Sequence, residues 1–169
     1  MSASLSKQLL ALTLITALML GFLGVAPAVA AAPVKVPSLN DPMVAETFQL
    51  VNDYRVKNRL KALRWNPGVA TWSQKWSDHL LADFASPRRS GTWHNPTFYT
   101  NYPARWTGAG ENVALNTSAR AMFDFWVTSE PHRKNMRNPN FTDFEFGYAK
   151  YTTGSYAGLS LGVQNFARY

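Results

Sequence analysis

The sequence contains no cysteine, and this absence excludes several kinds of chemistry. The chain can form no disulfide, and it has no thiol nucleophile and no cysteine ligand for a metal. Small domains in oxidising compartments commonly depend on disulfides, so this chain must be stabilised by its core alone. With 169 residues, of which 46% are hydrophobic and 14% aromatic, it is long enough for one domain with such a core.

Acidic residues are also scarce, since ten Asp and Glu oppose seventeen Lys and Arg and give a formal net charge of +7. The basic residues are dispersed, and only Arg88-Arg89 and Arg133-Lys134 are adjacent. This dispersion predicts a solvated surface and no nucleic-acid partner. A moderately basic surface nevertheless suits contact with an anionic cell wall or membrane surface.

One long apolar run is present, and it lies at the N-terminus. Lys7 precedes the apolar residues 9–25, and the small residues of Ala28-Val29-Ala30 follow them. This order is typical of a secretory signal peptide cleaved after Ala30, which predicts a secreted, extracellular protein. An uncleaved membrane anchor is the alternative, because the run approaches the ~18 residues that can span a bilayer. The predicted organisation is a signal peptide (1–30), a Pro-bearing linker (31–40) and one domain (41–169).

Two helices are predicted in the first half of the domain, over 42–59 and 67–84. Each begins with a capping residue followed by proline, and each continues with apolar residues at helical spacing. Trp72 and Trp76 dominate the apolar stripe of the second helix, so we expect that helix to be a principal core element. Arg55 is expected on the polar face of the first.

The following stretch, 86–109, has no periodicity and is rich in Pro, Asn, Gly and aromatic residues. We expect this long loop to pack on the domain and to form one wall of a cleft. A third helix is predicted to end near Ser129, where a short helix begins. Apolar residues then alternate over 144–148 and 159–163, which predicts two strands of a hairpin. This order of elements predicts an α+β layered domain.

The motifs together resemble the CAP superfamily (cysteine-rich secretory proteins, antigen 5 and pathogenesis-related 1 proteins) in its cysteine-free bacterial form. The segments that carry the resemblance are RVKNRLKALRWNPGVATWSQKWSDHLL (55–81), the loop residue His94, GENVA (110–114), FWVTSEPHRKNMRNPNFTDFEFGYA (125–149) and GVQNF (162–166). The resemblance implies a three-layer α-β-α sandwich with a mainly antiparallel sheet. It also implies a central cleft lined by histidines and acids.

The same resemblance identifies candidate cavity residues. His94 and Glu111 match two members of the family's tetrad, and His132 matches the histidine of the bacterial pattern. Animal and plant members of the family have an acid and a histidine at the remaining two tetrad positions, which correspond here to Ser129 and Leu161. That form of the tetrad is therefore not intact, and Glu130 is a candidate substitute for the acid. The expected cavity set is His94, Glu111, Ser129, Glu130 and His132.

These residue types permit several functions. Two imidazoles and a carboxylate suit Zn²⁺, which makes His94, Glu111 and His132 candidate metal ligands. Alternatively, Glu111 could bond His132 and backbone donors and only hold a loop in place. Ser129 beside His132 is better explained as a helix cap than as a nucleophile.

Two hypotheses therefore stand for the function. The first, which we favour, is a monomeric, non-catalytic binding module. Its cleft of His94, Glu111 and His132 can hold a divalent metal, and an adjacent apolar groove beside the aromatic loop can take a lipid or sterol. The second is a metal-dependent hydrolase, in which a metal-bound water attacks and Glu111 acts as base.

Overall fold

The computed structural model describes residues 35–85 and 93–169. The predicted signal peptide and residues 31–34 of the predicted linker lie outside the described residues. Within the described ranges, no helix is long and apolar enough to cross a membrane.

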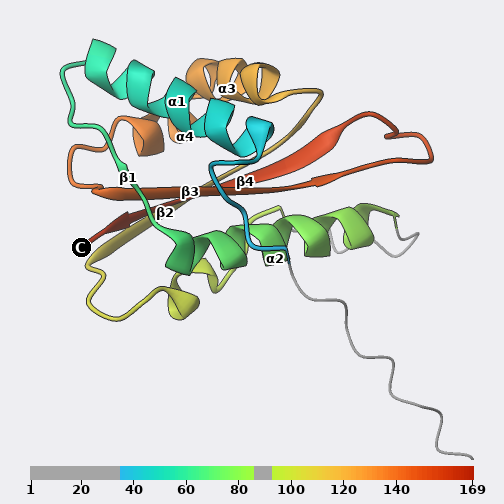
Figure 1. Ribbon diagram of the computed structural model, residues 1–169, viewed down its shortest axis with the longest axis horizontal. Coiled ribbons are helices and arrows are strands. Elements are labelled where there is room, and N and C mark those ends of the chain that lie inside the picture. The colour runs from blue at the N-terminus through green and yellow to red at the C-terminus, as the bar shows by residue number, and fades with distance from the viewer. Residues whose placement is uncertain (1–34, 86–92) are drawn as a thin grey trace, which may run out of the picture. The chain divides into compact units, whose positions relative to one another are not determined.

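The domain is a sheet between two layers of helix (Figure 1). The described strands form one sheet in the order β1-β3-β4-β2, in which β4 pairs antiparallel with both β3 and β2, and β1 pairs parallel with β3. Helices α1, α3 and α4 cover one face and α2 covers the other (Figure 1). The elements are α1 (Pro42–Lys57), β1 (Arg64–Trp65), α2 (Pro67–Ala85), the 3-10 helix η1 (Phe98–Asn101), β2 (Gly108–Asn116), α3 (Ala119–Thr128), α4 (Glu130–Met136), β3 (Asp143–Lys150) and β4 (Ser160–Arg168). The predicted three-layer α-β-α sandwich with a mainly antiparallel sheet is thus confirmed.

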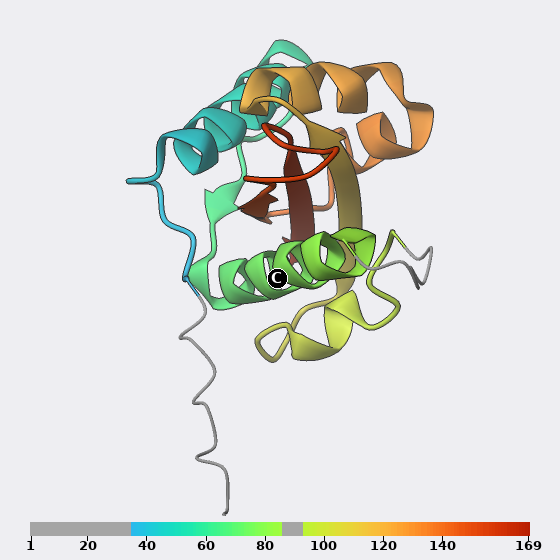
Figure 2. The ribbon, with the colours of Figure 1, turned by 90° about the vertical axis from the view of Figure 1, so that its right-hand side faces the viewer.

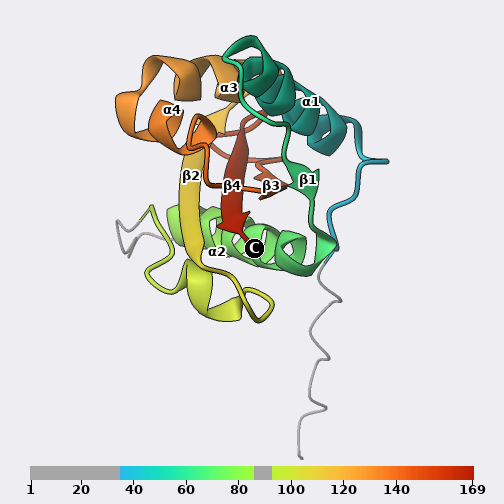
Figure 3. The ribbon, with the colours of Figure 1, turned by 90° about the vertical axis from the view of Figure 1, so that its left-hand side faces the viewer.

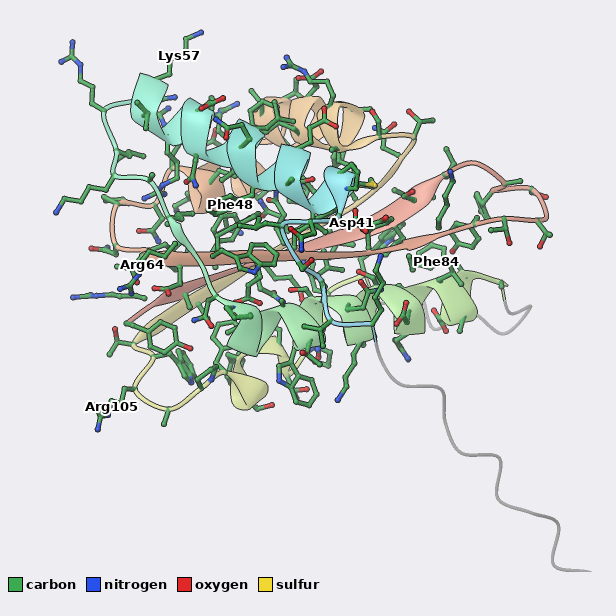
Figure 4. All side chains as sticks on the ribbon, viewed as in Figure 1. Asp41, Phe48, Lys57, Arg64, Phe84 and Arg105 are labelled. Atoms are coloured by element: carbon green, nitrogen blue, oxygen red, sulfur yellow. The ribbon has the colours of Figure 1, made fainter. Side chains whose placement is uncertain are left out.

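Helix α1 begins as the sequence predicts. The Asp41 side chain accepts from the backbone N–H groups of Met43 and Val44, and proline occupies the first turn. Phe48 points from the helix toward the sheet, whereas Lys57 at the end of the helix points away from it (Figure 4). The predicted apolar stripe therefore covers the sheet.

Arg55 departs from its expected place on the polar face of α1, because it is only 1% exposed. Its guanidinium donates to the backbone carbonyls of Lys61, Met136, Asn138 and Phe141 at 2.8–3.4 Å. Three of these carbonyls belong to residues in or beside chain turns, and that of Asn138 also accepts from the backbone N–H of Phe141. A guanidinium has five N–H donors in a fork and can satisfy several such acceptors at once. The expectation was wrong because the helix alone does not reveal these acceptors.

Helix α2 also corrects an expectation, since Trp72 and Trp76 are only half-buried. Ser77 is fully buried instead, and its hydroxyl lies 2.9 Å from the carbonyl oxygen of Gly147 in β3. A Cβ at Gly147 would lie 2.3 Å from the backbone nitrogen of Gln74. The helix backbone thus packs directly on the strand, which leaves no room for an indole between them.

Strand β2 was not predicted as a strand. Its sequence, GAGENVALN, contains one β-branched residue and several residues that are depleted in strands. It is extended because all nine of its residues pair in register with β4, from Gly108↔Arg168 to Asn116↔Ser160. This nine-residue strand forms the edge of the sheet to which the candidate site belongs.

Candidate functional site

The candidate residues come from three separate elements that meet at the β2 edge. His94 lies in the segment between α2 and η1, Glu111 lies in β2, and His132 lies in α4. β2 runs along the margin of the sheet, with α3 and α4 on one side and the segment before η1 on the other (Figures 2 and 3). The edge of the sheet at β2 therefore lies between α3 and α4 on one side and the segment that carries His94 on the other.

Glu111 and His94 are joined by a hydrogen bond at one end of the site. The His94 Nδ1 lies 2.9 Å from Glu111 Oε1, and the backbone N–H of Asn95 donates to the same oxygen at 3.0 Å. The Glu111 side chain is 2% exposed and that of His94 is 59% exposed. The hydrogen bond to Glu111 raises the pKa of His94, an effect that exceeds the opposite one of burial. The buried carboxylate thereby fixes the loop that carries the imidazole.

His132 lies on the opposite side, where its ring packs against Phe125 with centroids 5.4 Å apart. Burial, followed by the neighbouring charge of His94, lowers the pKa of His132, so its neutral form is favoured. Its buried Nδ1 has no hydrogen-bond partner in the structure, and neither has Glu111 Oε2. The Glu111–His132 bond considered from the sequence is therefore not formed, and Glu111 bonds His94 and Asn95 instead.

A network of side-chain amides that no sequence pattern predicted joins α4 to β2. The Asn112 amide donates to the carbonyl of His132 at 3.1 Å and to Gln164 Oε1 at 3.0 Å. The Asn135 amide donates to Asn112 Oδ1 at 2.9 Å and to the carbonyl of Glu111 at 3.0 Å. The only signal for these residues was their place within the GEN, HRKN and VQNF segments that carry the family resemblance.

Between the two sides lies a groove with a volume of ≈ 540 Å³. We call it the edge groove. Its floor is Val113–Leu115 of β2, one wall carries Trp93 and His94, and the other carries Phe125 and His132. Trp93 and Phe125 are 39% and 47% exposed, so they form aromatic rims. The edge groove is thus an apolar slot with two imidazoles on its walls.

Ser129 and Glu130 lie elsewhere. Ser129 joins the end of α3 to the start of α4, and its side chain makes no capping bond. Glu130 is exposed and pairs with Arg133. Neither residue lines the edge groove. Leu161, which the family resemblance matched to the other tetrad position, is fully buried in the core.

The structure does not assemble a metal centre from these residues. Among residues 35–85 and 93–169, no group of three or more His, Asp or Glu side chains is placed to hold a metal ion. His94 Nδ1 and Glu111 Oε1 are already bonded to each other. Zinc ligation by His94, Glu111 and His132 therefore stays a prediction, and no reaction step is derived from a metal.

Comparison with known proteins identifies a family-model match and a bacterial relative. Residues 48–166 match the family model described as "CAP: Cysteine-rich secretory protein family". The protein YkwD of Bacillus subtilis (strain 168) is 28% identical over 116 residues, which are 68% of this chain and 45% of YkwD.

Two solved structures show a similar fold. One is a crystal structure of an extracellular protein containing a SCP domain from Bacillus anthracis str. Ames, with a TM-score of 0.58, 24% identity and coverage of 80% of this chain and 45% of that chain. The other is an outer surface protein from Borrelia burgdorferi, with a TM-score of 0.55, 14% identity and coverage of 80% and 98%. The chain spans less than half the length of both Bacillus proteins.

Proposed function

This chain belongs to the cysteine-rich secretory protein (CAP) family, and we propose that it is an extracellular, non-catalytic binding module whose ligand lies in the edge groove. The groove itself carries this proposal, because it combines a mainly apolar lining with a few polar groups on its walls. Binding sites for small apolar ligands commonly have this composition.

The polar groups on the walls suit recognition of a ligand. Glu111 is held by two hydrogen bonds and positions His94. The imidazole of His94 lines the edge groove and is 59% exposed. A lipid or sterol with a small polar group is one candidate ligand, since its body fits the apolar lining and its polar group can bond an exposed imidazole.

Two observations support action outside the cytoplasm. The relatives include one protein described as extracellular and one described as an outer surface protein. The signal-peptide pattern at 1–30 favours the same location for this chain.

A fluorescence titration tests the proposal. We expect delipidated full-length protein to bind dansyl-undecanoic acid or NBD-cholesterol, and Phe125→Ser to bind at least tenfold more weakly. Loss of a large apolar contact is worth about 1.5–3 kcal/mol, which agrees with that factor. Val56→Ser is the matched control, because Val56 is an exposed apolar residue on α1, outside the edge groove. Equal affinity of wild type and Phe125→Ser would refute the groove as the binding site.

A further inference from the structure

The two edges of the sheet are unequally protected. Strand β1 has only two residues, and such a short edge strand offers little to pair with. Strand β2 has nine residues and contains no proline, lysine or arginine, the residues that commonly block an exposed edge. Strand β2 is therefore the edge open to pairing with another chain.

The hydrogen-bond pattern identifies which β2 groups face outward. In an antiparallel ladder, hydrogen-bonded and non-bonded residue pairs alternate. The N–H of Tyr151 donates to Leu159, which continues the β3–β4 register, so the odd-numbered residues of β4 bond β3 and the even-numbered residues bond β2. In β2, the odd-numbered residues therefore direct their N–H and C=O groups away from β4. Consistently, the outward carbonyl of Glu111 accepts from the Asn135 side chain.

Beyond Glu111 this edge is open. In the described part of the chain, no hydrogen bond reaches the outward N–H or C=O groups of Val113 or Leu115. The edge groove lies over these two residues, with Trp93 on one wall and Phe125 on the other. Main-chain donors and acceptors thus line the floor of an apolar slot.

We propose that the edge groove binds an extended peptide segment, which pairs with β2 at Val113–Leu115 as an added strand. The inference rests on the proposed function, because it names the ligand class of the same groove. An extended chain rises about 3.3 Å per residue and points alternate side chains to opposite faces. About three peptide residues would therefore pair with the floor, and apolar side chains would pack alternately against the Trp93 and Phe125 walls. A lipid would use the walls and leave the main-chain groups to water, so the floor favours a peptide.

The test starts from a random heptapeptide library displayed on phage and selected on the full chain, with Phe125→Ser used for counter-selection. The best peptide is then synthesised in two N-methylated forms, one modified at odd positions and the other at even positions. N-methylation removes a main-chain donor and keeps the side chain. We expect one form to bind at least 30-fold more weakly and the other to bind within threefold of the unmodified peptide.

Amide hydrogen exchange gives an independent readout. The amides of Val113 and Leu115 should exchange at least tenfold more slowly when the peptide is bound. The Ala114 amide serves as the internal control, because it already bonds β4 and should change little. Equal binding of the two N-methylated forms, or unchanged exchange at Val113 and Leu115, would overturn strand pairing.

Failure of this inference is distinguishable from failure of the proposed function. If the fluorescent lipid binds in a Phe125-dependent way while no peptide is enriched, the edge groove is a lipid site and the peptide inference is wrong. If neither probe binds, both proposals fail.

Discussion

At the scale of single residues, Glu145 is an acid placed where ionisation is costly. Its side chain lies in the interior, with the residue 1% exposed, and its Oε2 has no hydrogen-bond partner in the structure. It pairs across the sheet with Asn165, whose neighbour on the other side is Glu111. Burial, followed by the charge of Asp143, raises the pKa of Glu145 well above its usual range. The folded protein therefore favours the protonated carboxyl.

Replacement of Glu145 by Gln should change how stability depends on pH. A carboxyl group whose pKa is raised by folding contributes its full stability below its unfolded pKa of about 4.3, and loses it as pH rises toward the folded pKa. We expect the free energy of unfolding of Glu145→Gln to exceed that of wild type by on the order of 1–3 kcal/mol at pH 8. This difference should vanish near pH 4.5. Urea unfolding at several pH values measures this.

The surface substitution Glu46→Gln is the control for the change of charge, because Glu46 is exposed on α1. A Glu145→Gln variant that is destabilised equally at pH 5 and pH 8 would show that Glu145 is stabilising as a charged group.

Zinc binding is the second prediction at this scale. Ligation of Zn²⁺ by His94, Glu111 and His132 requires a rearrangement of the site, and it predicts a calorimetric binding heat that is lost in His94→Ala and His132→Ala. The heat should be retained in His79→Ala, the control, because His79 is an exposed residue of α2 outside the edge groove. Metal must displace the proton from His94, whose pKa is raised, so the affinity should fall as pH falls. Equal and negligible heats in all four proteins would end the metal hypothesis.

At the scale of elements, sequence patterns predicted what depends on local spacing. The buried face of α3, formed by Ala119, Met122, Phe123 and Trp126, matches its helical periodicity. The strand character of β2 could not be predicted, because it comes from pairing with β4 and not from its own residues. The same holds for the partner of Glu111, since a choice between His94 and His132 depends on how distant segments pack. The sequence could name the candidate residues of the site, but not their contacts.

Close packing of α2 on β3 leads to a prediction about Gly147. The substitution Gly147→Ala places a Cβ 2.3 Å from a backbone atom of α2, so the helix must move. We expect a loss of roughly 3 kcal/mol in the free energy of unfolding, as for overpacked cores. Gly108→Ala is the matched control, because its Cβ would meet its nearest atoms at 3.6 and 3.9 Å. Thermal unfolding of both variants measures this difference. If Gly147→Ala were as stable as Gly108→Ala, the contact between α2 and β3 would not be tight.

At the scale of the whole molecule, the family and the sandwich fold are established for residues 48–166. The signal-peptide pattern at residues 1–30 predicts export, and this prediction can be tested directly. When the full chain is expressed with a secretion system, the mature protein should begin at Ala31. N-terminal sequencing and intact mass determine this. Full-length protein retained in the membrane fraction would favour the uncleaved anchor.

The bonds of Arg55 have a consequence for the order of folding. Helix α4 has seven residues, whereas isolated helices shorter than about 12–15 residues are marginal in water. Arg55 binds the carbonyls of Met136 and Asn138 at the end of α4 from 81 and 83 residues away. Closing so long a loop is entropically costly, so α4 should become stable only after α1 has docked. The His132 wall would then be among the last parts to form, and a nascent chain would gain its binding groove only once the domain is complete.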